Sequence, residues 1–164
     1  MSRAGSVPGA AAVFDCRAPG PADTVRLGRL FGRWSPDGAV ILVEGGLGAG
    51  KTTFAQGVAS GCEVPGPVSS PTYNLVLHHL GRRPFVHADL YRLAGPEELE
   101  TLDLDEIFSP PGVAVVEWPE LVADRATPPW AAVALVRENG GRRITGRLIG
   151  EGWSAVREAL EAGP

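Results

Sequence analysis

The sequence predicts a single α/β domain in which a largely parallel sheet is flanked by helices and followed by a C-terminal β-hairpin and helix. Two mostly apolar runs, Ala39–Val43 and Gly112–Glu117, have the composition of strands that are buried on both faces, as in parallel sheets. Helical patterns alternate with such runs along the chain, which is typical of α/β proteins. Near the C-terminus, Asn139-Gly140-Gly141 separates two strand-like segments and therefore predicts a hairpin.

Length and composition fit one globular domain. The chain has 164 residues, of which 44% are hydrophobic and 21% are charged. Glycine and proline are spread along the chain, so we expect one domain at residues 11–164 after a flexible extension at residues 1–10. No stretch of about 18 consecutive apolar residues occurs, and no segment near the N-terminus has the pattern of a signal peptide. We therefore expect a cytoplasmic protein without membrane contact.

The individual elements follow from local patterns. Asp23 or Thr24 is expected to cap a first helix, in which apolar residues recur at helical spacing. Gly61–Pro71 is rich in Gly, Pro and Ser and is expected to be an exposed loop, and Gly95-Pro96-Glu97 favours a helix start. The expected strands are Val13–Cys16, Ala39–Val43, Asn74–His79, Pro84–Ala88, Gly112–Glu117, Trp130–Arg137 and Arg142–Ile149, and the later helices are Thr52–Ser60 and Ser154–Ala162.

The segment Gly45-Gly46-Leu47-Gly48-Ala49-Gly50-Lys51-Thr52 matches the P-loop motif G-x-x-x-x-G-K-[ST] in full. Glycines in such a loop turn several backbone N–H groups toward one point, where phosphate oxygens bind. Lys51 can reach between the β- and γ-phosphates, and the Thr52 hydroxyl can ligate Mg²⁺. The motif therefore predicts a site for ATP and Mg²⁺. The residues expected to contact the nucleotide here are Gly45, Leu47, Gly48, Ala49, Gly50, Lys51, Thr52 and Thr53.

Lysine usage supports this interpretation. Lys51 is the sole lysine of the chain, so the other long cationic side chains are all arginines. Lysine is favoured over arginine where a compact point charge is needed instead of a planar fork. The alternative is a glycine-rich turn that precedes Lys-Thr by chance, but the buried strand before the loop and the helix after it favour a phosphate site.

A second Mg²⁺ anchor is expected at the end of a neighbouring apolar strand. Glu117 follows Val113–Val116 and Asp89 follows Phe85–Ala88, so both carboxylates are candidates. An ordinary carboxylate at a strand end is the alternative for either one. Thr72 lies in the loop after the P-loop helix, where it is either a sensor of the γ-phosphate or a turn hydroxyl.

Four motifs occur in order and at compatible spacing, and together they resemble the TsaE (YjeE) family, the bacterial ATPase of tRNA threonylcarbamoyladenosine biosynthesis. The resemblance implies a single P-loop NTPase domain. It also implies that ATP hydrolysis supports the complex that attaches threonylcarbamoyl to tRNA. The motifs are Gly48-Ala49-Gly50-Lys51-Thr52-Thr53, Ser70-Pro71-Thr72-Tyr73-Asn74-Leu75-Val76, His87-Ala88-Asp89-Leu90-Tyr91-Arg92-Leu93 and Val116-Glu117-Trp118-Pro119-Glu120.

The resemblance also implies roles for individual residues. Thr52 and Glu117 hold Mg²⁺, and Asp89 is needed for turnover, so that Lys51, Asp89 and Glu117 form the catalytic set. Thr72 lies in a switch-like loop.

Two glycines complete the comparison with the family. Gly141, in the hairpin, matches a position near the nucleotide. Gly46 stands where the family usually carries an acid, which leaves the phosphate cradle intact but removes the polar side chain of that acid from the outer edge of the loop.

The charge distribution bears on the partners. The formal net charge is −4 and the arginines are scattered, which argues against a protein that holds nucleic acid by its own electrostatics. The family resemblance implies protein partners of the TsaD and TsaB type. We therefore expect tRNA to be reached only indirectly, through these partners.

Three other functions are alternatives to this one. A small P-loop kinase acting on a metabolite needs lid arginines, which Arg82-Arg83 could supply. A GTPase needs an Asn-Lys-x-Asp segment, and no such segment exists because Lys51 is the sole lysine. A scaffold with a relic nucleotide site is disfavoured by the intact motif. His87 alternates with Asp89 along one strand face, so it either shares the site of Asp89 or is a satisfied histidine at a strand end. Trp118 is expected to be a packing residue.

Overall fold

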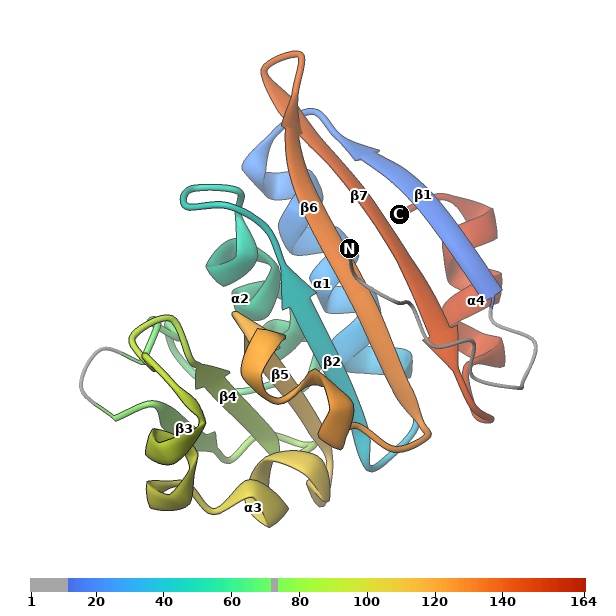
Figure 1. Ribbon diagram of the computed structural model, residues 1–164. Helices are drawn as coiled ribbons and strands as arrows, with labels where there is room; N and C mark the ends of the chain where they lie inside the picture. Colours follow the sequence, from blue (N-terminus) through green and yellow to red (C-terminus); the bar gives the residue numbers. More distant parts are fainter. Residues whose placement is uncertain (1–11, 72–73) are drawn as a thin grey trace.

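The computed structural model describes residues 12–71 and 74–164, and the strands of this part form one sheet with helices on both faces (Figure 1). The expected extension at residues 1–10 and the loop residue Thr72 lie outside the described residues. The strands are β1 (Ala12–Ala18), β2 (Ala39–Glu44), β3 (Val76–His79), β4 (Phe85–Asp89), β5 (Val113–Glu117), β6 (Trp130–Glu138) and β7 (Gly141–Ile149). The helices are α1 (Pro21–Trp34), α2 (Lys51–Gly61), α3 (Leu104–Phe108) and α4 (Ser154–Ala162), with short 3₁₀ turns η1 (Pro96–Thr101), η2 (Pro119–Leu121) and η3 (Ala123–Arg125).

The strand order is β1-β7-β6-β2-β5-β4-β3. The four central strands β6, β2, β5 and β4 are mutually parallel, whereas β7, β1 and β3 pair antiparallel with their neighbours. The α/β class is confirmed, but the largely parallel sheet expected from the sequence is a mixed one. The reason is that the short turns β3–β4 and β6–β7 can connect only antiparallel strands, while parallel neighbours need a longer crossover.

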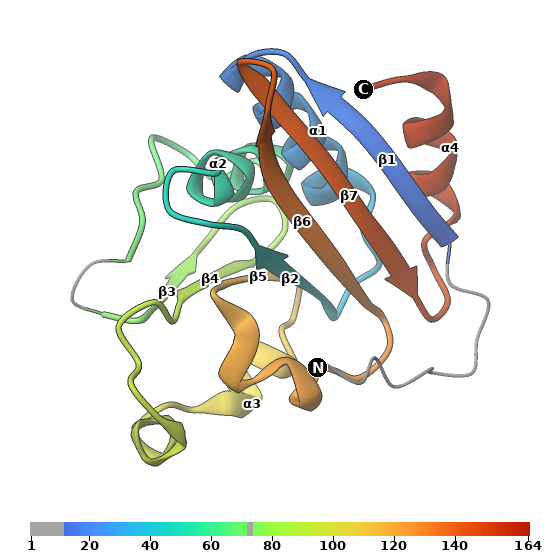
Figure 2. The same cartoon turned by 45° about the horizontal axis from the view of Figure 1, so that its top comes forward.

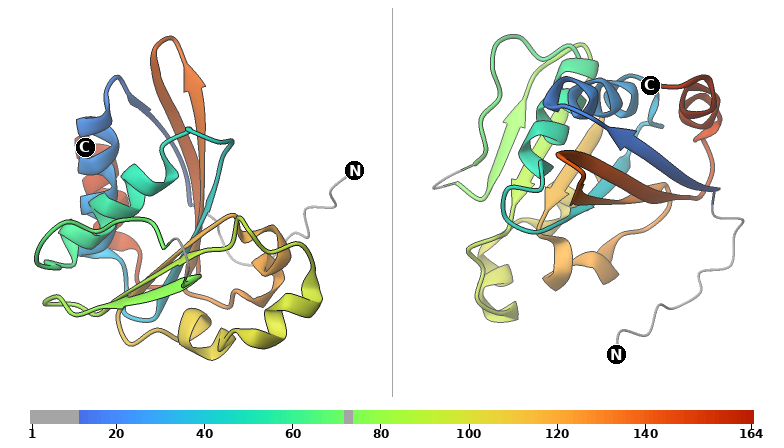
Figure 3. Two further views of the ribbon diagram at one scale, coloured as in Figure 1. Left: turned by 90° about the vertical axis from the view of Figure 1, so that its left-hand side faces the viewer. Right: turned by 90° about the horizontal axis from the view of Figure 1, so that it is seen from above.

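The two faces of the sheet are covered by different helices. Helices α1, α2 and α4 pack on one face, and α3 with the 3₁₀ turns covers part of the other (Figure 3). Each face carries its own hydrophobic core. Along β2, Ile41 and Val43 belong to the core under α1, α2 and α4, while Val40 and Leu42 belong to the core under α3 and the 3₁₀ turns. This central strand is thus buried on both faces, as its unbroken apolar run predicts.

Two local expectations need correction. Helix α1 begins at Pro21 with Gly20 as its N-cap, because proline has no N–H to satisfy at the first helical position. Asp23 instead lies inside the first turn and accepts a hydrogen bond from Gly20 N at 2.8 Å. The segment expected as the exposed loop Gly61–Pro71 is also partly packed. Val68 is buried, and Gln56 Nε2 donates to its carbonyl oxygen at 2.9 Å.

Helices α1 and α2 approach each other closely through glycines. A Cβ atom at Gly32 of α1 would lie 2.0 Å from the Val58 carbonyl oxygen, and one at Gly57 of α2 would lie 2.4 Å from the Val25 carbonyl oxygen. Gly28 and Gly61 have equally short approaches, of 2.3 and 2.2 Å. The two backbones are therefore in contact, which fixes α2 and with it the end of the P-loop.

We expect Gly32→Ala to destabilise the fold by about 1–3 kcal/mol, because an added methyl group meets backbone that cannot move aside. This cost should outweigh the gain in helix propensity of about 1 kcal/mol. Urea unfolding followed by circular dichroism measures the difference. Gly46→Ala is the control, since a Cβ atom there would meet nothing within 4 Å. Equal stability of the two variants would contradict the close packing.

Candidate functional site

The P-loop connects the carboxyl end of β2 to the first turn of α2, at the edge of the sheet where the parallel strands end (Figure 2). Gly48 and Gly50 have φ angles of 69° and 105°, which favour glycine. A cavity of about 330 Å³ opens beside the loop. Its lining residues are Leu47, Gly48, Gly50, Lys51, Thr52, Thr53, Asp89, Tyr91, Glu117, Trp118 and Arg142. The structure thus brings together most of the residues that the sequence singled out.

Lys51 is held by backbone oxygens and by an aromatic ring. Its Nζ atom donates to Gly45 O at 2.7 Å and to Gly46 O at 2.8 Å, and it lies 3.9 Å from the centroid of the Trp118 ring. Only 5% of the residue is exposed. The pKa of Lys51 is lowered by burial, an effect that the nearby charges of Glu117, Asp89 and Glu120 only partly offset. The Lys51 side chain therefore lines the cavity, but its ammonium group is hydrogen-bonded to the start of the P-loop.

Thr52 and Glu117 meet in a small group of oxygen atoms. The Thr52 hydroxyl lies 3.2 Å from both carboxylate oxygens of Glu117, and only 2% of Glu117 is exposed. A hydroxyl and a carboxylate are the hard oxygen ligands that Mg²⁺ prefers, and Mg²⁺ bound to a nucleotide keeps most of its other ligands as water and phosphate. The donor set therefore fits Mg²⁺, although no group of three or more His, Cys, Asp and Glu side chains that could hold a metal occurs among the described residues.

His87 contacts the Glu117 carboxylate from the neighbouring strand β4. The residue is fully buried, and its Nε2 atom lies 2.8 Å from Glu117 Oε1. Because a carboxylate accepts hydrogen bonds, Nε2 is the protonated nitrogen in this contact. The Nδ1 atom is buried and has no hydrogen-bond partner among the described residues. The sequence suggested that His87 could share a site with Asp89, but the structure pairs it with Glu117.

Asp89 lies beside Glu117 without sharing its contacts. The two residues are direct partners in the register of β4 and β5. Ser70 Oγ donates to Asp89 Oδ2 at 2.7 Å, and the backbone N–H of Tyr91 donates to Oδ1 at 3.1 Å. Asp89 therefore faces the cavity and is also connected to the loop that precedes β3.

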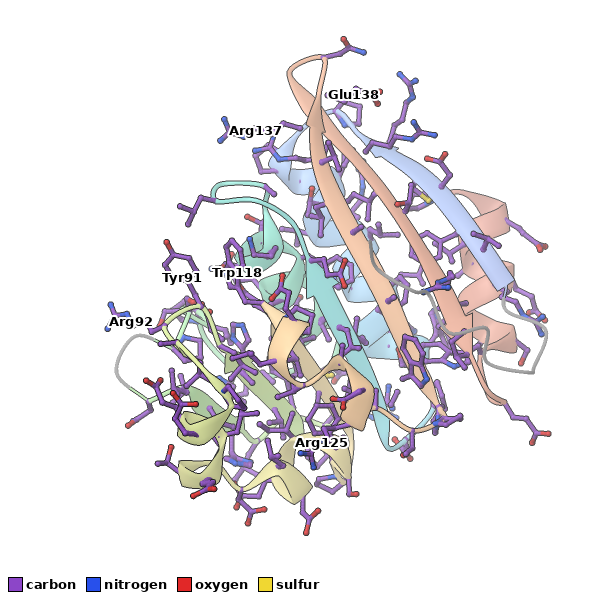
Figure 4. The ribbon with its side chains drawn as sticks, viewed as in Figure 1. Tyr91, Arg92, Trp118, Arg125, Arg137 and Glu138 are labelled. Carbon is purple, nitrogen blue, oxygen red and sulfur yellow. The ribbon has the colours of Figure 1, made fainter. Side chains whose placement is uncertain are left out.

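Trp118 has a more specific place than the packing role expected from the sequence. It lies directly after β5 with a φ angle of 55°, which is uncommon for a residue with a side chain. Its ring lies 4.8 Å from the ring of Tyr91, and both side chains stand at the ends of neighbouring strands (Figure 4). Together with the Lys51 contact, this makes Trp118 a wall of the cavity.

Gly141 begins β7 beside a second cavity of about 140 Å³. A Cβ atom at Gly141 would lie 2.6 Å from Ala18 O, so the close approach of the β1–α1 connection requires glycine there. Gly50 and Thr53 line the same cavity. The structure therefore places Gly141 next to the P-loop, and its position near a bound nucleotide stays a prediction.

Two arginines were missed by the sequence analysis. Arg137 and Arg142 extend from β6 and β7 and donate hydrogen bonds to P-loop carbonyl oxygens. The signal was present in the alternation of the hairpin, since Leu135 and Ile144 are buried and the next inward positions toward the turn are these arginines. The pattern changes from apolar to cationic where the hairpin passes the P-loop.

Arg82 and Arg83, the candidate lid arginines, lie away from the cavity. Arg83 donates to the carbonyl oxygens of Gly32 and Ser35, both at 2.7 Å, and so fastens the end of α1. Arg82 lies 3.5 Å from Glu63 at the surface. Thr72 falls outside the described residues, so its position relative to the cavity stays a prediction. In residues 12–71 and 74–164, every helix is too short or too polar to cross a bilayer.

Comparison with known proteins identifies relatives along most of the chain. The family model described as threonylcarbamoyl adenosine biosynthesis protein TsaE matches residues 18–144. The chain is 36% identical to the tRNA threonylcarbamoyladenosine biosynthesis protein TsaE of Treponema pallidum over 131 residues, which cover 79% of this chain and 97% of that protein. It is 34% identical to the protein of the same name from Bacillus subtilis over 148 residues, covering 88% and 91% of the two chains.

The fold has a counterpart among solved structures. The crystal structure of Bacillus subtilis YdiB superposes with a TM-score of 0.75 at 27% sequence identity, covering 94% of this chain and 97% of the other. A mycobacterial relative also named TsaE, from Mycobacterium tuberculosis, is 40% identical over 134 residues, or 76% of this chain and 77% of its own length. The chain therefore belongs to the TsaE family of threonylcarbamoyl adenosine biosynthesis proteins.

Proposed function

We propose that this protein is a Mg²⁺-dependent ATPase that supports the threonylcarbamoyladenosine modification of tRNA. One observation carries the proposal. The Thr52 hydroxyl of the P-loop lies 3.2 Å from both carboxylate oxygens of the buried Glu117, so two oxygen groups suited to Mg²⁺ lie together next to the loop proposed to bind phosphate. The ends of β2 and β5 and the start of α2 meet at this point. A glycine-rich turn with a purely structural role would not require a hydroxyl and a buried carboxylate beside it.

The chain's own residues divide the work of binding. The P-loop glycines present backbone N–H groups to the phosphates, and Lys51 contributes a charge once it leaves the Gly45 and Gly46 carbonyl oxygens. Thr52 and Glu117 would hold Mg²⁺, which when bound neutralises charge on the phosphate oxygens. The contact from His87 keeps the Glu117 carboxylate turned toward Thr52.

Asp89 is suited to a different role in turnover. It lines the cavity next to Glu117 but bonds to Ser70 and to the Tyr91 backbone instead of Thr52. A carboxylate in this place can orient the attacking water and accept its proton. The bond to Ser70 also links this carboxylate to the loop that contains Thr72, which is the proposed switch-like segment.

The nucleoside is expected to extend toward the hairpin. The cavity beside Gly141 adjoins the P-loop through Gly50 and Thr53, and four of its ten lining residues are glycines and two are prolines. Such a hollow can receive a flat base against the chain. This supports Gly141 as a nucleotide-binding position in addition to the P-loop residues from Gly45 to Thr53.

A metabolite kinase has less support than an ATPase. The arginines that could have served a kinase lid, Arg82 and Arg83, contact Glu63 and the end of α1 instead of the cavity. The relatives carry names of tRNA threonylcarbamoyladenosine biosynthesis proteins, which agrees with a role in that modification. With a net charge of −4, the protein is proposed to act in the cytoplasm through protein partners of the TsaD and TsaB type, which contact the tRNA.

Lys51→Ala should remove most ATP binding while the fold stays intact. Charge-assisted contacts to phosphate are worth roughly 1.5–3 kcal/mol each, so a loss of affinity of at least about tenfold is expected. Isothermal titration calorimetry with ATP and Mg²⁺ measures it, and circular dichroism checks the fold. Unchanged affinity in a folded variant would overturn the phosphate site.

Glu117→Gln should raise the Mg²⁺ concentration needed for half-maximal ATPase activity, since an amide is a weaker ligand than a carboxylate. Asp89→Asn should instead lower the turnover rate, by about 100-fold if Asp89 accepts a proton. Glu44→Gln is the matched control, because Glu44 ends the parallel strand β2 but is exposed. Normal Mg²⁺ dependence of Glu117→Gln would show that the roles are wrongly assigned.

The isolated protein should bind tRNA negligibly at physiological salt, because its net charge gives no long-range attraction to a polyanion. With partner proteins of the TsaD and TsaB type, it should form a complex that depends on ATP, and Thr72→Ala should weaken that complex. Size-exclusion chromatography with and without ATP provides the measurement. Tight, salt-resistant tRNA binding without nucleotide-dependent association would rule out this mode of action.

A further inference from the structure

The turn end of the β6–β7 hairpin carries two arginines that face each other. Arg137 and Arg142 are direct partners in the antiparallel register. The alternation of the strands places both on the side of the sheet where Leu135 and Ile144 are buried. Like charges directly opposite each other destabilise a strand pair. The pair therefore needs negative or dipolar partners nearby.

The partners are two consecutive carbonyl oxygens of the P-loop. Arg142 donates from Nε to Ala49 O at 2.6 Å and from Nη2 to Gly48 O at 3.0 Å. Arg137 donates from Nε to the same Gly48 oxygen at 3.1 Å, and in Figure 4 it projects from the side of the hairpin that faces the P-loop. A Cβ atom at Gly48 would lie 2.8 Å from Arg137 Nη2, so this glycine makes room for the guanidinium group.

Holding a carbonyl oxygen also fixes the N–H group of the next residue. In a planar trans peptide, the C=O and N–H bonds point in opposite directions. With Ala49 O bound to Arg142, the N–H group of Gly50 is turned away from the arginine. Gly50 is the last glycine of the P-loop, and it lines the phosphate cavity and the smaller cavity beside the hairpin.

The arginines are needed most when Lys51 acts on a phosphate. In this structure Lys51 holds the carbonyl oxygens of Gly45 and Gly46, at the start of the loop. If Lys51 turns to a phosphate, these two oxygens lose that donor. The bonds from Arg137 and Arg142 do not involve Lys51 and can persist, so they keep the second half of the loop in place.

We propose that Arg142, assisted by Arg137, is a positioning residue that holds the P-loop in the conformation that receives phosphate. This inference rests on the proposed function, because it assigns the hairpin a role in nucleotide binding. Arg142 acts through backbone carbonyl oxygens, and neither arginine needs to contact the nucleotide. The hairpin is thereby a structural part of the phosphate site, although about ninety residues separate it from the loop, 93 in the case of Arg142 and Ala49.

The test compares nucleotide affinity and loop order in Arg142→Ala. Because the loop as a whole is affected, affinities for ATP and ADP should fall by the same factor, at least about tenfold. In the nucleotide-free protein, amide hydrogen exchange at Ala49 and Gly50 should become faster while exchange in β2 and β5 stays unchanged. Arg142→Lys should recover only part of the affinity, because a single ammonium group cannot span two carbonyl oxygens as a guanidinium does.

Arg143→Ala is the matched control. Arg143 is the next residue of β7, but it lies on the opposite face and pairs with Asp15 at 2.6 Å, so affinity and exchange should both stay normal. Lys51→Ala, measured in parallel, distinguishes a failure of the positioning role of Arg142 from a failure of the proposed phosphate site. If Lys51→Ala loses ATP and Arg142→Ala does not, the positioning role is wrong and the proposed function stands. If neither variant loses ATP, the phosphate site itself is wrong. A loss confined to ATP would show direct contact with the γ-phosphate and would also overturn the positioning role.

Discussion

The proposed nucleotide site requires a P-loop whose N–H groups stay free for phosphate while its carbonyl oxygens are satisfied, and the arrangement of the site depends on the donors that satisfy them. Unpaired backbone oxygens near the protein interior are costly. Here the cationic groups of Lys51, Arg137 and Arg142 supply the donors, from the loop itself and from the hairpin. Four of the backbone oxygens that they contact lie on the segment 45–49. The cations therefore stabilise a loop whose glycines would otherwise allow many conformations.

The order of the central strands determines the chemistry next to this loop. Because β5 pairs in parallel with β2, and β4 pairs in parallel with β5, the carboxyl ends of both strands reach the same edge of the sheet as the P-loop. This places Glu117 against Thr52 and leaves Asp89 one strand further away. Two carboxylates with similar sequence environments thus have different partners. The difference in their proposed roles follows from strand order and not from local sequence.

The position of helix α2 also determines the geometry of the site, because its first turn contains Lys51 and Thr52. The glycine contacts with α1 bring the two backbones together, and Phe31 and Phe54 pack edge to face with ring centroids 5.6 Å apart. The opposite face of the sheet is covered by shorter helices, and Trp118, directly after Glu117, is the N-cap residue of the 3₁₀ turn η2. Packing on both faces therefore converges on the same edge of the sheet.

The sequence by itself determined the α/β class, the position of each strand to within a few residues, the P-loop and the two candidate carboxylates. These features depend on local patterns, such as an unbroken apolar run or a motif of eight residues, which neighbouring residues specify. Only the tertiary structure decided that β5 lies between β2 and β4, that Glu117 and not Asp89 contacts Thr52, that His87 supports Glu117, and that the hairpin arginines bind the P-loop. The Thr52–Glu117 contact spans 65 residues, and the Arg142–Ala49 contact spans 93. Such contacts depend on which strands become neighbours when the two cores are packed, and no local pattern in the chain encodes that choice.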